Sequence, residues 1–186
     1  MSRAPFVAEV ADLGLSSGLP RSATSATIPH VNRPHLRRLD QVWIEAPIYF
    51  ITTETDRRRS VLACSTAAKV LLREFEAAPV RHGWMIGRYV IMPDHIHFFC
   101  AEGGDRAPTP LADFVGRLKQ WSAKAIVKSL GLEPPLWQRE FFDHVLRSSE
   151  SYESKWRYVV ENPVRAGLVA RAEDWPYAGE VAPLIL

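Results

Sequence analysis

Residues 84–101, WMIGRYVIMPDHIHFFCA, decide the fold. Residues 84–92 and 95–101 are rich in β-branched and aromatic side chains, which is typical of strands. Pro93 and Asp94 lie between these two runs and favour a turn. The stretch therefore predicts two consecutive strands joined at Pro93-Asp94.

The segments on either side predict two further strands and three helices. Residues 42–53, VWIEAPIYFITT, favour a strand in which Pro47 indicates an edge position or a bulge. Residues 141–147 favour a short strand. The order strand, helix, strand, strand, helix, strand, helix predicts an α+β, ferredoxin-like fold, with helices packed on a mainly antiparallel sheet.

The three helices are expected over residues 60–78, 111–130 and 148–161. Ser60 can cap the first helix, and Pro79 stops it. Gly131 ends the second helix, and Ser148 or Ser149 can cap the third. These boundaries depend on local signals alone.

Composition limits the class of protein without naming a ligand. The chain has 186 residues, of which 47% are hydrophobic, and a net charge of +2, so it is not typical of disordered chains. It has no apolar run long enough to span a membrane, and its two cysteines are too few for a secreted disulfide framework. We therefore expect a cytoplasmic protein without a membrane partner.

The expected organisation has three parts. Residues 1–38 are rich in Ser, Pro, Ala and Gly, which predicts an N-terminal extension. Residues 39–178 form the expected domain, and residues 179–186 form a short tail.

The first candidate site is the pair His95 and His97. Side chains alternate along a strand, so both imidazoles share one face about 7 Å apart, where they can converge on a metal ion. A bare H-x-H pair is more often two surface or hydrogen-bonded histidines. The spacing does not fit the histidine-triad hydrolases, the metallo-β-lactamases or the two-histidine phosphoesterases, whose further His, Asp or second H-x-T/S positions are absent.

The second candidate site is on the third helix. Tyr152, Trp156, Val159 and Pro163 follow helical spacing and predict its buried stripe. Tyr158 lies on the opposite, polar side, where its hydroxyl can act on a ligand or can simply pack at the helix margin. Asn162 follows four residues later on the same face, as a metal ligand, a C-terminal helix cap, or both.

The third feature is the acid-free stretch 114–128, FVGRLKQWSAKAIVK. One stripe along the predicted helix carries Phe114, Leu118, Trp121 and Ala125. A neighbouring stripe carries Arg117, Lys124 and Lys128 and is either a solvated face or a set of phosphate contacts. The basic turn that contains Arg57 and Arg58 adds to the second interpretation.

A series of motifs in a fixed order completes the pattern. They are Met92-Pro93-Asp94-His95-Ile96-His97, Trp137-Gln138, Asp143-His144-Val145-Leu146-Arg147, Tyr158-Val159-Val160-Glu161-Asn162-Pro163-Val164-Arg165-Ala166-Gly167-Leu168-Val169 and Asp174-Trp175-Pro176-Tyr177. Over about residues 41–178 the chain resembles the REP-associated tyrosine transposases, a branch of the single-tyrosine HUH transposases of insertion sequences.

This resemblance implies a ferredoxin-like HUH endonuclease that cuts and rejoins single-stranded DNA at or near palindromic hairpins. It implies that Tyr158 is the nucleophile, joined to a 5′ phosphate in the intermediate. It also implies that His95, His97 and Asn162 hold Mg²⁺ or Mn²⁺. His144 and Arg147 belong to a family motif and either bind DNA or support the sheet, while Trp137 more often packs in a core.

Two rival functions remain open at this stage. A domesticated regulator would bind hairpin DNA without transferring strands, although intact His95, His97, Tyr158 and Asn162 argue against it. A metal protein without a nucleic-acid partner does not account for the basic stripe or the series of motifs. The spacing fits a monomer and also a homodimer in which the tyrosine serves the partner's histidines.

Overall fold

The computed structural model describes residues 47–184, and the predicted extension 1–38 lies outside them. Within this range, β2 (Trp84–Ile91) and β3 (His95–Glu102) pair antiparallel, as residues 84–101 predict. β1 (Ile48–Glu54) pairs with the other edge of β3, and β4 (Phe142–Leu146) pairs with β1. A short β5 (Ala178–Glu180) adds to β2, so the strand order is β4-β1-β3-β2-β5.

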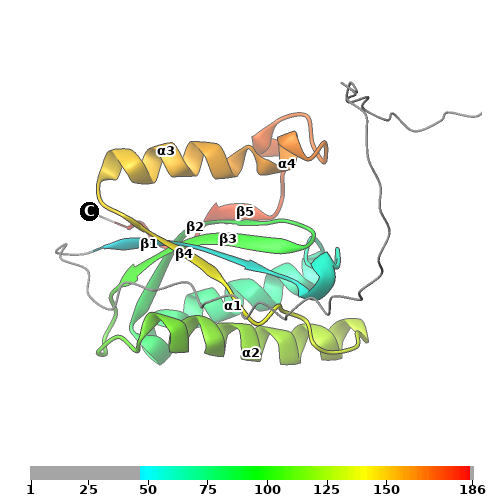
Figure 1. The fold of residues 1–186 in the computed structure, drawn as a ribbon, viewed down its shortest axis with the longest axis horizontal. Helices are drawn as coiled ribbons and strands as arrows, with labels where there is room; N and C mark the ends of the chain where they lie inside the picture. Colours follow the sequence, from blue (N-terminus) through cyan, green and yellow to red (C-terminus); the bar gives the residue numbers. More distant parts are fainter. Residues whose placement is uncertain (1–46, 185–186) are drawn as a thin grey trace, which may run out of the picture. The chain divides into compact units, whose positions relative to one another are not determined.

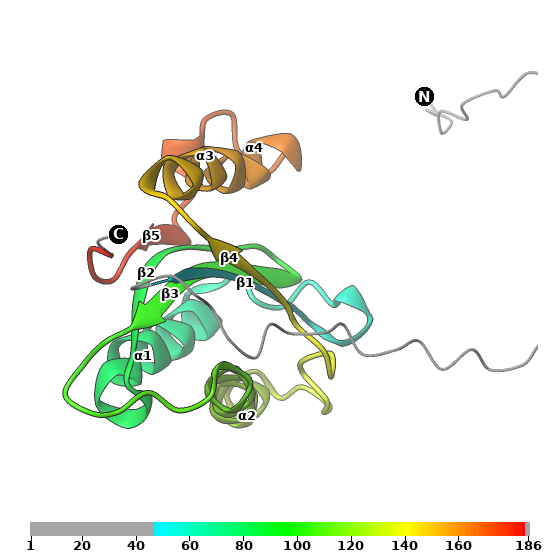
Figure 2. The ribbon, with the colours of Figure 1, turned by 60° about the vertical axis from the view of Figure 1, so that its left-hand side comes forward.

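Helices cover both faces of this sheet (Figure 1). α1 (Ser65–His82) and α2 (Leu111–Leu130) lie on one face, and α3 (Ser149–Val160) lies on the other, as a second view also shows (Figure 2). Apart from one short 3₁₀ turn, the elements from β1 to β4 follow the β-α-β-β-α-β order of ferredoxin-like folds. The predicted α+β fold with a mainly antiparallel sheet is therefore confirmed.

The alternation along β3 divides the core in two. Ile96, Phe98 and Cys100 are fully buried in the cluster beneath α1 and α2. Phe99 belongs to the second cluster, with Tyr152 and Val159 of α3. The side chains on the His95 and His97 face therefore point toward α3.

Short segments connect and extend these elements. They are η1 (Asp56–Arg58), a 3₁₀ turn after β1, α4 (Asn162–Arg165), which follows α3, and η2 (Ala172–Asp174), which precedes β5. The fourth predicted strand, over residues 141–147, is β4, and Ser148 caps α3. β5 gave no strand signal and carries the sheet to Glu180, beyond the predicted domain end at 178.

The first helix differs from its prediction at both ends. It begins at Ser65 rather than Ser60, because Leu62 is fully buried and its N–H donates to the carbonyl of Pro93 at 2.8 Å. Pro79 lies inside the helix, which continues to Gly83 in the left-handed conformation at φ 70°.

The edge position predicted from Pro47 is wrong, and the apolar stripe of α2 is only partly buried. Pro47 does not mark an edge, because it precedes β1, a strand with neighbours on both sides, and so needs no ladder partner. Trp121 is 49% exposed, and Ser122 takes the buried position on α2 instead. The Ser122 hydroxyl donates to the Leu118 carbonyl at 2.7 Å and accepts from Trp137 Nε1 at 3.0 Å, so its burial leaves no unpaired polar group.

Among residues 47–184, no helix is both long enough and apolar enough to cross a bilayer.

Candidate active site

The two histidines of β3 lie together on the face toward α3. Their ring centroids are 4.7 Å apart. His95 Nδ1 lies 2.7 Å from Asp94 Oδ1, and His97 Nδ1 lies 2.8 Å from Thr52 Oγ1. When each Nδ1 carries the proton and donates, Nε2 keeps its lone pair for a ligand, as in metal-binding histidines.

His97 is held in its neutral form. Burial is the largest cause, and the nearby charges of His95, Arg58, Lys155 and Arg165 add to it, so that the pKa of His97 falls from 6.5 to about 3. The Phe50 ring also stacks on the imidazole, with a centroid distance of 5.4 Å. A neutral imidazole at physiological pH is the form that binds a metal ion.

Charged and polar side chains fix the position of Asp94, whose carboxylate contacts the His95 ring. Arg58 Nε lies 2.8 Å from Asp94 Oδ2, and Arg58 also ion-pairs with Glu54. Glu54 in turn accepts a hydrogen bond from Gln138 Nε2 at 3.2 Å. The sequence predicted that Arg58 contacts DNA, whereas in the structure its guanidinium pairs with the Asp94 carboxylate that contacts His95.

Tyr158 lies on α3 where its hydroxyl reaches solvent. Tyr152 and Val159 are 5% and 1% exposed, whereas Tyr158 is 63% exposed. The predicted buried stripe is thus confirmed, with Pro163 buried and Trp156 partly buried. The capping box at Ser148, in which its hydroxyl accepts from the Ser151 N–H at 3.1 Å, fixes the start of this helix.

Asn162 begins α4 and is not the cap of α3, because Glu161 occupies the C-cap position. Arg165 links Asn162 to the tyrosine. Its Nη2 donates to the Tyr158 carbonyl at 2.6 Å and to Asn162 Oδ1, and its guanidinium lies 4.2 Å from the centroid of the Tyr158 ring. The proposed nucleophile and the proposed third ligand are therefore connected through one arginine.

Sequence reasoning missed three residues around this site. Arg165 and Lys155 both place positive charge near His97, and Lys155 Nζ lies 5.2 Å from the Phe50 ring centroid. Phe142 is 49% exposed and pairs with Thr52, the hydrogen-bond partner of His97. The alternation along residues 141–147 places Phe142 on the site face and was the one available signal.

The predicted DNA contacts divide between two surfaces. His144 is exposed and lies opposite Phe50 in the β1 and β4 ladder, so it shares the face of the histidine pair. Arg147 is exposed between β4 and α3. Arg57 is exposed on η1, while Arg117, Lys124 and Lys128 are exposed on α2, on the far side of the sheet. Trp137 is 6% exposed and packs in the core.

The donor set limits what metal the site can hold. Within the described part of the chain, no group of three or more His, Cys, Asp and Glu side chains gathers as a metal site. His95 and His97 would supply two imidazole ligands, and the third ligand that the resemblance implies is the Asn162 amide oxygen, which accepts a hydrogen bond from Arg165. An oxygen and nitrogen set of this kind fits Mn²⁺ or Mg²⁺ with further oxygen ligands from DNA or water.

Comparison with known proteins gives the family. The profile of the family described as "Transposase IS200 like" matches residues 46–162. A REP-associated tyrosine transposase of Escherichia coli strain K12 is 28% identical over 138 residues, which cover 73% of this chain and 78% of that protein. A second relative, from Haemophilus influenzae and also described as a REP-associated tyrosine transposase, is 30% identical over 95 residues. These residues cover 47% of this chain and 54% of that protein.

The fold comparison agrees. A solved structure of a REP-associated tyrosine transposase bound to a REP hairpin superposes with a TM-score of 0.59 at 22% identity, covering 77% of this chain and 82% of that one. Because the family profile spans more than half of the chain, the protein belongs to the IS200-like transposases. The resemblance to REP-associated tyrosine transposases is confirmed.

Proposed function

We propose that the protein is a metal-dependent DNA nicking and joining enzyme that acts on single strands at or near palindromic hairpins. The observation that carries this proposal is an exposed tyrosine on α3 together with a half-buried, neutral histidine on the sheet face that this helix covers. The relative bound to a REP hairpin supports hairpin DNA as the substrate class.

In this proposal Tyr158 Oη attacks the scissile phosphorus. The new bond joins the tyrosine oxygen to the 5′ phosphate, the bond from phosphorus to the 3′ oxygen breaks, and the phenol proton goes to solvent while the leaving oxygen takes up a proton. A 3′ hydroxyl can later attack the phosphotyrosine, so rejoining needs no nucleotide cofactor.

The surrounding residues position the phosphate. Lys155 and Arg165, whose charges reach His97, can hold its oxygens and stabilise the charge of the transition state. His95 and His97, with Asn162 as the third ligand, would hold Mg²⁺ or Mn²⁺, which supplies charge neutralisation at the phosphate. Phe142 and His144 can contact unpaired bases on the same face.

The basic surface of α2 has a separate role in this proposal. Arg117, Lys124 and Lys128 are exposed on α2, which covers the face of the sheet opposite α3, so they would contact phosphates distant from the cleaved bond. Since both curated relatives come from bacteria, we place the activity on chromosomal DNA in the bacterial cytoplasm.

A covalent-adduct assay tests the reaction. Wild type incubated with a labelled single-stranded hairpin and Mg²⁺ or Mn²⁺ should give a protein-DNA adduct that survives denaturing electrophoresis. Tyr158→Phe should give none, whereas Tyr152→Phe, which removes a buried hydroxyl from the same helix, should retain it. An adduct in Tyr158→Phe would show that another residue is the nucleophile.

A second assay tests the metal site. His95→Ala should abolish cleavage and retain most of the hairpin affinity, because the DNA phosphates bind elsewhere as well. Cleavage by this variant at the wild-type rate would remove His95 from the ligand set. Hairpin binding by wild type without any adduct would instead favour a regulator that no longer transfers strands.

A further inference from the structure

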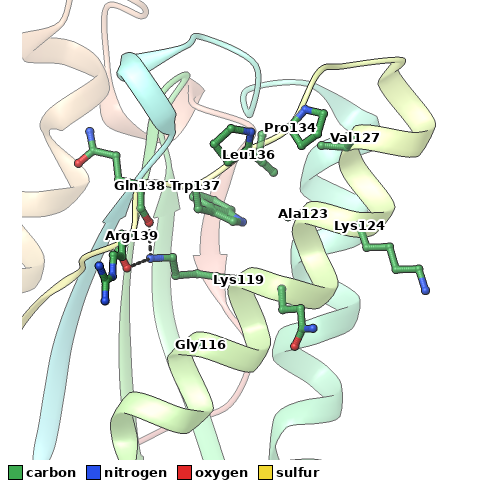
Figure 3. Close-up of a pocket in the computed structure, with 12 residues that line it drawn as sticks. Gly116, Lys119, Ala123, Lys124, Val127, Pro134, Leu136, Trp137, Gln138 and Arg139 are labelled. Carbon is green, nitrogen blue, oxygen red and sulfur yellow. Dashed lines mark hydrogen bonds between the residues drawn. The ribbon is translucent and has the colours of Figure 1, made fainter.

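A pocket between α2 and the segment that follows it is not used by the proposed reaction (Figure 3). Its volume is about 400 Å³, within the range of small-molecule sites. Its walls are mainly apolar and include Ala123, Val127 and Pro134. The lining residues, all within 47–184, include the cations Lys119, Lys124 and Arg139 and no aspartate or glutamate.

The outer wall of this pocket is fixed by hydrogen bonds to the rest of the domain. The Leu136 carbonyl accepts from the Asp56 N–H at 2.7 Å, and the Glu133 carbonyl accepts from Arg59 Nη1 at 2.8 Å. Lys119 Nζ donates to the Gln138 and Arg139 carbonyls at 2.6 and 2.9 Å. The pocket is thus preformed, so a ligand would not have to order its walls.

Gly116 lines the pocket, and neither its backbone conformation nor its packing requires a glycine at this position. It lies inside α2, it is not among the glycines with positive φ, and a Cβ built there would meet nothing within 4 Å. Glycine inside a helix costs about 1 kcal/mol relative to alanine. Its one evident effect is to leave this side of the pocket open.

The pocket is also connected to the catalytic face. Gln138, a lining residue, donates through Nε2 to Glu54, and Glu54 is paired across the ladder with His95. One hydrogen bond therefore links the wall of the pocket to the residue that lies opposite His95 in the sheet. Lys124 lies at the pocket and also contacts the exposed Trp121 ring, at 5.8 Å from its centroid.

We propose that this pocket binds one unpaired nucleotide of the single strand that flanks the hairpin. The base occupies the apolar interior, and its phosphates lie against Lys124 and Arg139, because an apolar pocket with a cationic rim complements an aromatic base attached to an anion. The proposal rests on the proposed function in so far as the ligand is DNA.

The decisive variant is Gly116→Leu. The added side chain takes up space at the wall of the pocket without meeting a neighbour at its Cβ, and the helix gains propensity, so the variant should fold at least as stably as wild type. Ser129→Leu, which adds the same side chain to an exposed position of α2 outside the pocket, is the matched control. Lys124→Glu is a second variant that leaves the interior unfilled.

The measurement is fluorescence anisotropy in a Tyr158→Phe background. One probe is a blunt hairpin, and the other is the same hairpin with a randomised single-stranded extension of about ten nucleotides. Gly116→Leu should weaken binding of the extended probe by roughly tenfold and leave the blunt probe unchanged. Lys124→Glu also removes a general phosphate contact, so it should weaken both probes, and the extended probe clearly more than the blunt one. Equal affinities for wild type and both variants, or equal losses on both probes, would overturn the proposal.

Two readouts separate this proposal from the others. Gly116→Leu with Tyr158 intact should still form the covalent adduct at saturating DNA. If wild type itself forms no adduct, the proposed reaction is contradicted, whereas the pocket is judged by the anisotropy measurement alone. Sedimentation of wild type and of Gly116→Leu without DNA tests whether a second copy of the chain occupies the pocket instead. A change of oligomeric state in Gly116→Leu, with DNA affinity unaltered, would assign the pocket to a second copy of the chain and overturn the nucleotide site.

Discussion

His97 is the residue of the site on which burial acts most strongly. Its imidazole is enclosed by Phe50 and Thr52, and its pKa of about 3 lies far below the usual 6.5. Between these two values the unfolded chain binds a proton that the folded chain does not. Stability contributed by the neutral imidazole is therefore present above pH 6.5 and is lost as the pH falls toward 3.

Replacing this histidine should flatten the pH dependence of stability. Wild type should lose up to about 1.4 kcal/mol of unfolding free energy per pH unit below pH 6.5 that His97→Gln does not lose. Urea denaturation at several pH values between 7 and 4 measures this difference between the two proteins. The buried His82 also has a lowered pKa, but its contribution is the same in both proteins and cancels in the difference. His144→Gln, at an exposed site, is the control, and parallel curves for wild type and His97→Gln would contradict the expectation.

Arg165 is the second residue of the site whose contacts lead to a prediction. Its planar guanidinium bonds the Tyr158 carbonyl and Asn162 and covers the tyrosine ring, a set of contacts that a lysine ammonium does not reproduce. Arg165→Lys should lower the single-turnover rate of adduct formation about tenfold and change hairpin affinity far less. Arg157→Lys, at an exposed position of α3, should retain the wild-type rate. An affinity loss as large as the rate loss would point to simple DNA binding.

At the scale of elements, α3 depends on its first turn. Ser148 and Ser151 form the capping box, and the helix then carries Tyr152 and Val159 into the core and Tyr158 out of it. Ser148→Ala should cost about 1 kcal/mol of unfolding free energy, measured by urea denaturation. Ser154→Ala, in the exposed middle of the same helix, should cost far less, and an equal loss in both variants would show that the cap has no special weight.

Elements with local signals at both ends were predictable from the sequence. α2 begins at Leu111 and ends at Leu130 as predicted, because Gly131 adopts the left-handed conformation that the pattern indicates. The start of α1 was not predictable, since the extended segment before it is fixed by burial of Leu62 and by pairing with Pro93. β5 is three residues long and exists through its pairing with β2.

The site divides in the same way. The histidine pair and Tyr158 could be found from motifs, and strand alternation correctly placed both histidines on one face. The contacts of Arg165, the pairing of Arg58 with Asp94 and the proximity of Lys155 to His97 join residues from different elements. No local pattern predicts such contacts, because tertiary packing determines them.

At the scale of the whole domain, the sheet separates two basic regions. Lys155 and Arg165 lie on the histidine face, whereas Arg117 and Lys128 are exposed on α2 across the sheet. DNA that reaches α2 must extend around the domain, so contacts there should add affinity without assisting the chemical step. Under the proposed function, these local basic regions allow a protein with a net charge of only +2 to bind a polyanionic partner.

A double charge reversal on α2 tests this separation. Arg117→Glu with Lys128→Glu should weaken hairpin binding and reduce the slope of log K against log salt by about 1 to 2, since each phosphate contact contributes about 0.7 to 0.9. The rate of adduct formation at saturating DNA should stay at the wild-type value. Lys69→Glu with Arg73→Glu makes the same charge change on the exposed side of α1 and corrects for long-range electrostatics. If both double variants reduce the slope equally, the α2 residues act through net charge and not through contact with DNA.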